Sequence, residues 1–239
     1  MYFVDNEGVT DARRNLALEE YVLRHAPAGE DCLLFYVNAP AVIIGRNQNT
    51  VEEIDPAVVA ERGVTVVRRL SGGGAVYHDG GNLNFSFHTP HAADRFNRYE
   101  AFLGPVLEAL RALGIPAELG GRNDVTVGGR KVSGNAQFTT TRRMFSHGTL
   151  LVDADLDAVS AVLRPRPGKV ESKGVKSVRA RVANLAEFAP GLTVGRLRAL
   201  ILERLFGTAD AARLPRLPLG AAGWAAVDGL VAARYGSDA

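Results

Sequence analysis

Hydrophobic positions recur along this chain with a period of about 3.6 in some segments and of two in others. The first period is typical of a helix with one buried face, and the second of a strand with one buried face. Stretches rich in proline, glycine, asparagine and aspartate separate these segments. In chain order, the pattern predicts helices over residues 11–25, 55–63, 99–113, 156–163 and 193–205, and strands over residues 33–37, 41–44, 64–67, 83–87 and 144–152.

Capping residues support several of these boundaries. Asp11, Asp55 and Thr193 each stand directly before a helical pattern, where an N-cap side chain is needed. Pro105 falls inside the helical pattern over residues 99–113, so it predicts either a kink or a later start. Gly128–Gly129 joins two short apolar alternations, which indicates a β-hairpin.

Helices and strands follow one another here without a regular βαβ alternation, which predicts an α+β fold. We expect a mixed or antiparallel sheet with flanking helices. We expect residues 1–213 to form one domain. Residues 214–239 then form a linker that contains Pro215 and Pro218, followed by a terminal helix around Trp224 that packs on the same domain. The alternation over residues 83–87 predicts a half-buried strand.

Charge and cysteine content exclude several classes of protein. The net charge is only +2, so we expect no nucleic-acid partner. Cys32 is the single cysteine, which excludes an internal disulfide and fits a reducing compartment. The sequence shows no signal-peptide pattern and no run of about 18 apolar residues. A cytoplasmic protein without a membrane partner is therefore expected.

A glycine-rich loop follows the strand predicted at 64–67. Arg68 and Arg69 precede three glycines, Gly72–Gly74, and Tyr77 and His78 come after them. Glycines let backbone N–H groups approach an anion, and arginines can bind a phosphate or carboxylate through two hydrogen bonds. The loop lacks the Gly-Lys-Ser/Thr ending of a Walker A motif, and no helix pattern follows as in a dinucleotide fingerprint. It therefore predicts an anion site of another kind.

Lys131 lies just inside the second strand of the predicted hairpin. Only four of the 28 basic residues are lysines, and the other three lie in residues 169–176. Since arginine is the usual cation of this chain, these lysines suggest positions that need a compact point charge.

Several longer segments together resemble one family. RRLSGGGAVYHDGGN, GRNDVTVGGRKVSGNAQ, HGTLLVDADL and SKGVKSVRARVANL, with NLALEEYVL and VIIGRNQN before them, are similar in sequence and order to lipoate–protein ligases. The resemblance runs from near the start of the chain to Leu185. It implies the catalytic fold shared with biotin–protein ligases and octanoyltransferases. It also implies an enzyme that forms or uses lipoyl-AMP and attaches the lipoyl group to a lysine of a lipoyl-domain acceptor.

The resemblance assigns ligands and residues. It implies ATP as cofactor and lipoate or octanoate as substrate, with Lys131 as the catalytic cation. Mg²⁺ would share in neutralising the phosphate charge, and Asp124 is the candidate carboxylate near the phosphates. The resemblance also implies that a loop over residues 166–181 folds over the adenylate. The implied nucleotide-binding residues are Arg69, Gly74, Ala75, Val76, Tyr77, Asn82, Asn123 and Lys131. The implied residues for lipoate or acyl-adenylate are Ser71, Gly72, Gly73, Gly74, His78, Lys131, Gly134, Ala136, His147 and Thr149.

These residues fit the chemistry of carboxylate activation. An anionic carboxylate must approach a highly charged ATP, so cations and backbone amides are needed around the α-phosphate. Ser71 resembles a nucleophile only through its nearness to His78, and no oriented acid follows in a triad pattern. We therefore interpret Ser71 as a ligand donor, and His78 as a hydrogen-bonding loop residue. The scattered histidines argue against a zinc site.

Other functions remain open from the sequence. Many family members continue into a small accessory domain, whereas this chain ends at Ala239, which leaves two alternatives: adenylation with a separate accessory subunit, or transfer from a preformed acyl-adenylate or another acyl donor. An octanoyl or lipoyl transferase that takes its acyl group from a carrier would need a cysteine nucleophile, and Cys32 is the only candidate. A non-catalytic binder of acyl-adenylate or lipoyl domains and a biotin ligase are further alternatives.

Overall fold

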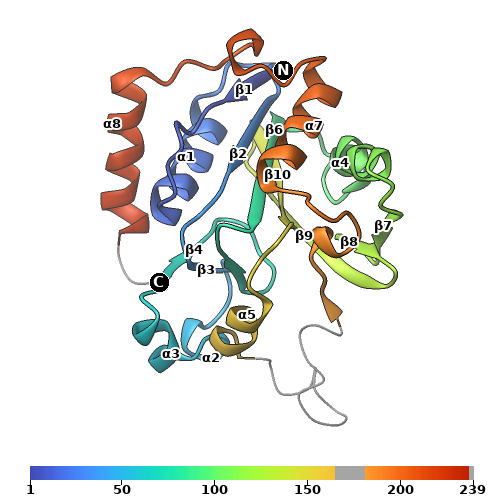
Figure 1. Ribbon diagram of the computed structural model, residues 1–239. Coiled ribbons are helices and arrows are strands. Elements are labelled where there is room, and N and C mark those ends of the chain that lie inside the picture. Colours follow the sequence, from blue (N-terminus) through green and yellow to red (C-terminus); the bar gives the residue numbers. More distant parts are fainter. Residues whose placement is uncertain (165–180, 237–239) are drawn as a thin grey trace.

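The computed structural model describes residues 1–164 and 181–236, and it builds them into two sheets with helices around them (Figure 1). The large sheet has seven strands in the order β1-β2-β6-β10-β9-β8-β7, and the small sheet has the order β4-β3-β5. The strands are β1 (Tyr2–Val4), β2 (Cys32–Tyr36), β3 (Ala41–Ile44), β4 (Thr65–Arg68), β5 (Val76–His78), β6 (Asn82–Pro90), β7 (Ala117–Gly120), β8 (Asp124–Val127), β9 (Arg130–Thr139) and β10 (Arg143–Leu151).

The helices begin close to the predicted positions. Asp11 and Asp55 accept hydrogen bonds from backbone N–H groups of the turns that follow them, and Thr193 does the same. None of the described helices is long and apolar enough to cross a bilayer. The helices are α1 (Ala12–His25), α2 (Thr50–Glu53), α3 (Pro56–Glu61), α4 (Glu100–Ala112), α5 (Leu156–Val162), α7 (Val194–Phe206) and α8 (Gly220–Leu230), with short helical turns η1 (Leu185–Glu187), η2 (Ala211–Arg213) and η3 (Val231–Tyr235).

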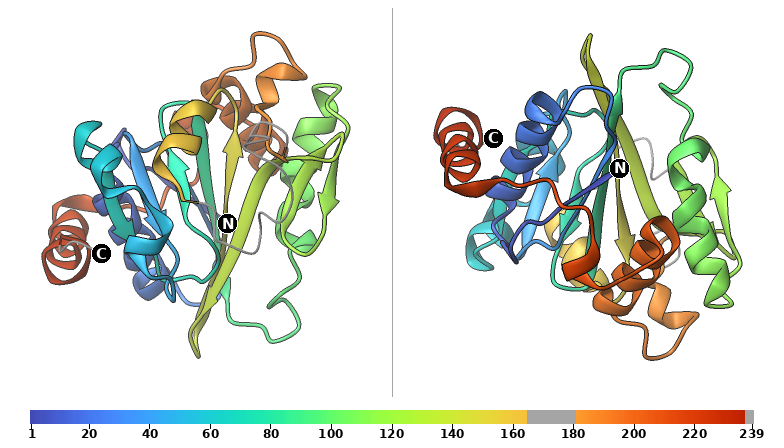
Figure 2. Two further views of the ribbon diagram at one scale, coloured as in Figure 1. Left: turned by 90° about the horizontal axis from the view of Figure 1, so that it is seen from below. Right: turned by 90° about the horizontal axis from the view of Figure 1, so that it is seen from above.

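The two faces of the large sheet are covered by different helices. Helices α4 and α7 lie together on one face, and α1 lies on the other with α8 outside it (Figure 2). Strand β2 shows the division, because Leu33 and Phe35 join the core under α4 and α7 while Leu34 and Tyr36 join the core under α1. This arrangement confirms the expected α+β class with a mixed sheet.

Strand β6 lies between β2 and β10 in the large sheet, and the prediction of a half-buried strand was wrong for it. Phe85 and Phe87 point into the core beneath α4 and α7. The alternate side chains, including Asn84, Ser86 and His88, are also buried, at no more than 1 % exposure. The alternation of apolar and polar residues therefore separates an apolar core from a buried polar face. Asn84 of that polar face lines the candidate site.

Strands β2 and β3 follow each other in the chain but belong to different sheets. Strand β2 pairs antiparallel with β6, whereas β3 pairs parallel with β4 and antiparallel with β5. The glycine-rich loop, residues 69–75, connects β4 to β5 across β3. Gly45, directly after β3, leaves room for it: a Cβ at Gly45 would lie 2.2 Å from the carbonyl oxygen of Gly73.

The predicted hairpin is present between β8 and β9. Gly128 and Gly129 both have positive φ, 56° and 77°, as a type I′ turn requires. Pro105 lies inside α4, which begins five residues earlier at Glu100, so the late start predicted as one alternative is wrong.

The C-terminal segment packs on α1. The hydroxyl of Tyr235 donates a 2.6 Å hydrogen bond to the fully buried carboxylate of Glu20, and Arg14 pairs with Asp228. The predicted loop over the adenylate falls almost entirely within residues 165–180 and thus lies outside the described residues.

Candidate active site

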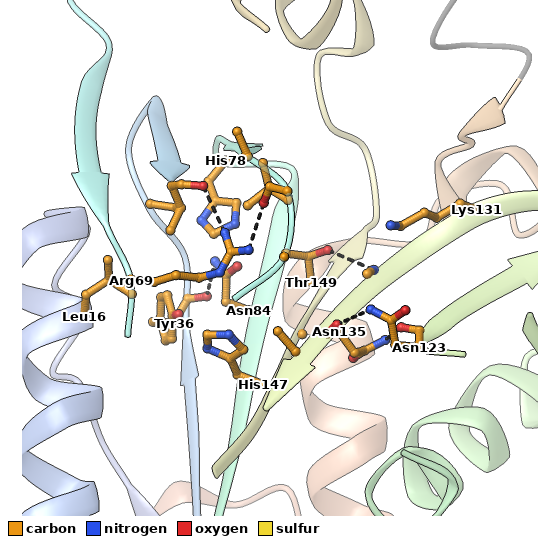
Figure 3. A pocket seen from close by; sticks show the side chains of 18 residues that line it. Leu16, Tyr36, Arg69, His78, Asn84, Asn123, Lys131, Asn135, His147 and Thr149 are labelled. Atoms are coloured by element: carbon orange, nitrogen blue, oxygen red, sulfur yellow. Dashed lines mark hydrogen bonds between the residues drawn. The ribbon is translucent and has the colours of Figure 1, made fainter. Parts of the chain in front are cut away.

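A cavity of about 300 Å³ opens between the two sheets, α1 and the hairpin strands. Leu16 and Tyr36 lie at one end of it in Figure 3, and Lys131 and Asn123 lie at the other. One end is therefore bordered by an aliphatic and an aromatic side chain beside the buried Arg69, and the other by Lys131. The remaining lining residues are Ile43, Arg69, Gly73, Gly74, Ala75, Val76, His78, Asn84, Gly134, Asn135, Ala136, His147, Gly148 and Thr149.

The structure brings most of the predicted site residues to this cavity, although they come from three strands, the glycine-rich loop and the turn before β8. Some of them lie elsewhere. Tyr77 packs in the core of the small sheet, and Asn82 is fully buried, with its amide nitrogen bonded to Asn84. Ser71, Gly72 and Asp124 do not line the cavity. The predicted residues that line the cavity are Arg69, Gly73, Gly74, Ala75, Val76, His78, Asn123, Lys131, Gly134, Ala136, His147 and Thr149.

Arg69 shapes the glycine-rich loop from within. Its guanidinium donates to the carbonyl oxygens of Ile43, Gly72 and Gly74 and to the hydroxyl of Ser71, at 2.7–3.2 Å. Only 7 % of the side chain is exposed, and burial lowers the pKa of Arg69 to about 10, so it stays charged. Because carbonyls of the loop turn toward this buried cation, Arg69 sets the curve of the backbone around the cavity.

The conformation of this loop requires a glycine at position 73. The φ of Gly73 is +97°, a region that side chains with a Cβ rarely adopt. A Cβ there would also lie 2.8 Å from Nη2 of Arg69. Gly72 has neither restriction, since its φ lies outside the positive region and a Cβ there would meet no atom of the described residues within 4 Å.

Lys131 reaches the cavity because strand β9 bulges. Val125 pairs with Ser133 but Thr126 pairs with Lys131, so the register shifts by one residue between them. A bulge of this kind re-aims side chains. The Lys131 ammonium lies over Gly134, where a Cβ would be 2.7 Å from its nitrogen. The same nitrogen forms a 2.8 Å ion pair with Oδ1 of Asp124 on the neighbouring strand.

Ser71 and His147 form a hydrogen-bonded chain with Glu19, which corrects the sequence-based interpretation of Ser71. Nε2 of His147 lies 2.7 Å from the Ser71 hydroxyl, and Nδ1 lies 2.9 Å from the Glu19 carboxylate. Ser71 therefore has His147 as its histidine partner, and Glu19 is the oriented acid on the other ring nitrogen. Although burial opposes ionisation, the charge of His147 and its hydrogen bond lower the pKa of Glu19.

This chain of groups positions His147 at the wall of the cavity. Nδ1 of His147 donates to the Glu19 carboxylate, and Nε2 faces the Ser71 hydroxyl, so both ring nitrogens are held. Ser71 is only 1 % exposed, and Arg69 also donates to its oxygen. The serine is therefore enclosed between two polar partners, which suits a structural part in the wall better than attack on a substrate.

Sequence reasoning missed Glu19, Tyr36, Asn84 and Asn135 as site residues. The available signal was the pair of adjacent glutamates on the apolar side of the first helix, because buried carboxylates need partners. Strand residues such as Asn84 and Asn135 gave no local signal, since their importance depends on which strands are neighbours.

The described part of the chain contains no group of three or more His, Cys, Asp and Glu side chains that could hold a metal ion. Asp124 does not line the cavity but is joined to its cationic end by the ion pair with Lys131. Cys32 is fully buried in β2, away from the cavity, and burial raises the pKa of its thiol to about 11. Cys32 therefore lies away from the cavity and is protonated near pH 7, whereas a cysteine nucleophile must be accessible and ionised.

The chain matches known proteins along most of its length. The family described as "Lipoyl protein ligase A/B catalytic domain" matches residues 11–206. Lipoate-protein ligase LplJ of Bacillus subtilis is 50 % identical over 236 residues, which are 98 % of this chain and 71 % of the relative.

Solved structures agree with this assignment of the fold. A bi-partite lipoate protein ligase of Thermoplasma acidophilum, studied with its E2 lipoyl domain, superposes with a TM-score of 0.86 at 29 % identity, over 99 % of this chain and 93 % of the other. A lipoate-protein ligase A bound with ATP gives a TM-score of 0.81 at 29 % identity, over 95 % and 92 % of the two chains.

Proposed function

Because the chain belongs to the lipoyl protein ligase A/B catalytic-domain family, we propose that it is a lipoate–protein ligase. It joins lipoate to AMP, or takes up preformed lipoyl-AMP, and transfers the lipoyl group in amide linkage to a lysine of a lipoyl-domain protein. The relatives named above are lipoate ligases, one of them described with an E2 lipoyl domain and another with bound ATP.

One observation carries the proposal: a single cavity has a cationic end at Lys131 and an apolar and aromatic end at Leu16 and Tyr36. Lipoate has the matching polarity, with a carboxylate at one end of an aliphatic chain. The glycine-rich loop borders the same cavity through Gly73–Val76, where backbone groups can approach a nucleotide.

In the first step, an oxygen of the lipoate carboxylate attacks the α-phosphorus of ATP and pyrophosphate leaves. Two anionic groups must approach, so positive charge at the point of contact lowers the barrier. Lys131 supplies a compact cation there, and its stem is held over Gly134. Asp124, 2.8 Å from the ammonium, orients it.

In the second step, the amine of the acceptor lysine attacks the acyl carbonyl of lipoyl-AMP. The C–N bond forms, the C–O bond to phosphate breaks, AMP leaves with the electron pair, and the amine nitrogen releases its proton to water. Lys131 is the described cation nearest this end of the cavity, so it stabilises negative charge on the carbonyl oxygen and on the departing phosphate.

Mg²⁺ fits the site through Asp124. At nucleotide sites this ion is commonly held by one or two carboxylates together with phosphate oxygens and water. Asp124 offers one carboxylate beside Lys131, and 36 % of its side chain is exposed. When bound, the ion would neutralise phosphate charge during adenylation.

Two further elements belong to the proposal. A separate accessory subunit assists the adenylation step, in line with the bi-partite ligase of Thermoplasma acidophilum. The protein acts in the cytoplasm, where a lone free cysteine such as Cys32 remains reduced. A transferase that uses a cysteine nucleophile is disfavoured, because Cys32 is fully buried and its pKa is raised to about 11.

A mass measurement on the acceptor tests the proposal. The pure chain is incubated with a lipoyl domain and either lipoate plus Mg-ATP or preformed lipoyl-AMP, each with and without a candidate accessory subunit. We expect the lipoyl mass increment from lipoyl-AMP in all cases. Absence of the increment from lipoyl-AMP under every condition would contradict the proposed function.

A further inference from the structure

Three asparagine side chains connect the N-terminal segment to the cavity; we call Asn6, Asn15 and Asn38 the amide relay. The relay starts at the carbonyl oxygen of Val9, which lies 2.8 Å from Nδ2 of Asn6 and 2.9 Å from Nδ2 of Asn15. Asn15 contacts Asn38 at 2.9 Å, and Asn38 contacts Nδ1 of His78 at 3.0 Å.

The direction of every hydrogen bond in the relay follows from its starting point. A backbone carbonyl can only accept, so the atom of Asn15 that faces Val9 must be the amide nitrogen. That nitrogen also faces Asn38, so the atom it meets there must be the carbonyl oxygen. The other end of Asn38 is then its NH₂ group, which donates to Nδ1 of His78.

The relay therefore determines which ring nitrogen of His78 carries the proton. A nitrogen that accepts from an amide has no hydrogen, so in the neutral ring the hydrogen is on Nε2. Asn15 and Asn38 are fully buried and His78 is 3 % exposed, so water does not compete with these bonds.

Nε2 of His78 is left without a partner. It is buried, and no described residue bonds to it. His78 nevertheless lines the cavity, as Figure 3 shows. A buried N–H group costs free energy when it has no acceptor. We therefore expect the bound molecule to supply the acceptor.

We propose that the amide relay holds His78 in its Nε2–H form, as a fixed donor to an acceptor oxygen of the acyl-adenylate. The inference rests on the proposed function for the identity of the ligand. His78 is then a binding residue, and Asn15 and Asn38 are positioning residues that act through it.

The charges around His78 fit a neutral donor. Burial, followed by the charges of Arg69 and His147, lowers the pKa of His78 to about 3. The ring is therefore neutral near pH 7, and it offers one N–H without adding a second cation beside Arg69. Because the tautomer is set before the ligand arrives, no proton has to move on binding.

Asn38→Asp reverses the relay with almost no change of shape. The carboxylate still accepts from Asn15, but it has no hydrogen to donate to Nδ1 of His78. We expect the proton of His78 to move to Nδ1, which leaves Nε2 facing the ligand as an acceptor. Asn97→Asp, an exposed site with the same chemical change, is the matched control.

Two measurements test the proposal. The first is ¹⁵N NMR of the histidine rings in the free wild-type protein, with His78 assigned from the signal missing in His78→Gln. We expect Nε2 protonated and Nδ1 unprotonated in wild type, and the reverse in Asn38→Asp. The opposite tautomer in wild type would overturn the relay, whether or not Asn38→Asp folds.

The second measurement is calorimetric binding of lipoate, of a non-hydrolysable ATP analogue and of a sulfamoyl analogue of lipoyl-AMP. We expect Asn38→Asp to weaken the adenylate analogue at least tenfold and Asn97→Asp to leave it unchanged. If Asn38→Asp also binds lipoate more weakly, the acceptor oxygen belongs to the acyl group. If it instead binds the ATP analogue more weakly, the acceptor oxygen belongs to the nucleotide. A reversed tautomer with unchanged affinity would overturn donation by His78. Failure of wild type to bind any of the three would contradict the proposed function, while the tautomer would still decide the relay.

Discussion

The ammonium nitrogen of Lys131 lies 2.8 Å from a carboxylate oxygen of Asp124, on the strand next to its own. The side chains of the pair are 38 % and 36 % exposed. An ion pair this accessible contributes only about 0–1 kcal/mol to stability. The pair therefore contributes little to folding stability, and its exposure leaves it accessible to a ligand. The first two predictions concern these two residues.

Lys131→Ala should abolish lipoyl transfer and leave the fold intact. Loss of the cation removes stabilisation in both chemical steps, so turnover should fall below about a tenth of wild type, a barrier increase of at least roughly 1.4 kcal/mol. Lys131→Arg should also fail, because the guanidinium is larger and planar. Arg130→Ala, which removes the neighbouring cation on the Glu187 side, should retain activity. If the turnover of Lys131→Ala is close to that of wild type, Lys131 is not a catalytic residue.

Asp124→Asn should separate the two steps. Adenylation from Mg-ATP should fall and require more Mg²⁺, because the carboxylate that would hold the ion is gone. Transfer from preformed lipoyl-AMP should change less than about threefold, or roughly 0.7 kcal/mol. The exposed Asp94→Asn is the control. An equal fall in both steps would mean that Asp124 acts only by orienting Lys131.

Gly73→Val should weaken binding of the lipoyl-AMP analogue. Valine is strained at a φ of +97°, and its Cβ would displace Nη2 of Arg69, which holds the loop. Gly72→Ala should bind normally, because Gly72 lacks both restrictions. Calorimetry on the two variants is the measurement, and equal affinities would show that the shape of the loop is not needed for binding.

Stability should depend on pH through His88. Burial, and then the charges of Arg143 and His147, lower the pKa of His88 to about 3 against the opposing charge of Glu19. Between pH 3 and the ordinary value of about 6.5 the unfolded chain holds a proton that the folded chain lacks, so stability rises with pH in this window.

His88→Gln removes this titration. The slope of unfolding free energy against pH should fall by as much as one proton, about 1.4 kcal/mol per pH unit, between pH 4 and 6. Urea unfolding at a series of pH values measures it. Above pH 7 the two proteins should differ by a constant amount. Identical slopes at acid pH would contradict the buried neutral state of His88.

Tyr235→Phe should destabilise the protein by about 1–3 kcal/mol, since it removes a hydrogen bond to a buried carboxylate. Tyr235 is 2 % exposed, and its hydroxyl lies 2.6 Å from Oε2 of Glu20. Tyr2→Phe deletes a hydroxyl for which the described structure gives no hydrogen bond, and it serves as the control in urea unfolding. Equal stabilities would show that η3 is not held to α1 by this bond.

Local features of this protein follow from the sequence alone. The caps at Asp11, Asp55 and Thr193, the hairpin at Gly128–Gly129 and the glycine-rich loop were predicted where the structure has them. Each depends on interactions within a few residues, such as a side chain that accepts from the next turn or a glycine that adopts positive φ. The motifs around the loop and Lys131 also indicate the family without any tertiary information.

The wall of the cavity was decided only by the tertiary structure. Glu19 and His147 are 128 residues apart in the chain, and Asn38 and His78 are 40 apart. The sequence pattern of β6 predicted solvent on its polar side, but α1 packs against β6 and that side is a buried polar face. Hydrophobic periodicity shows which face of a strand is apolar and which is polar. It does not show which element packs against either face. Strand order and helix packing supply that information, because contacts between distant residues form only when the whole sheet is assembled.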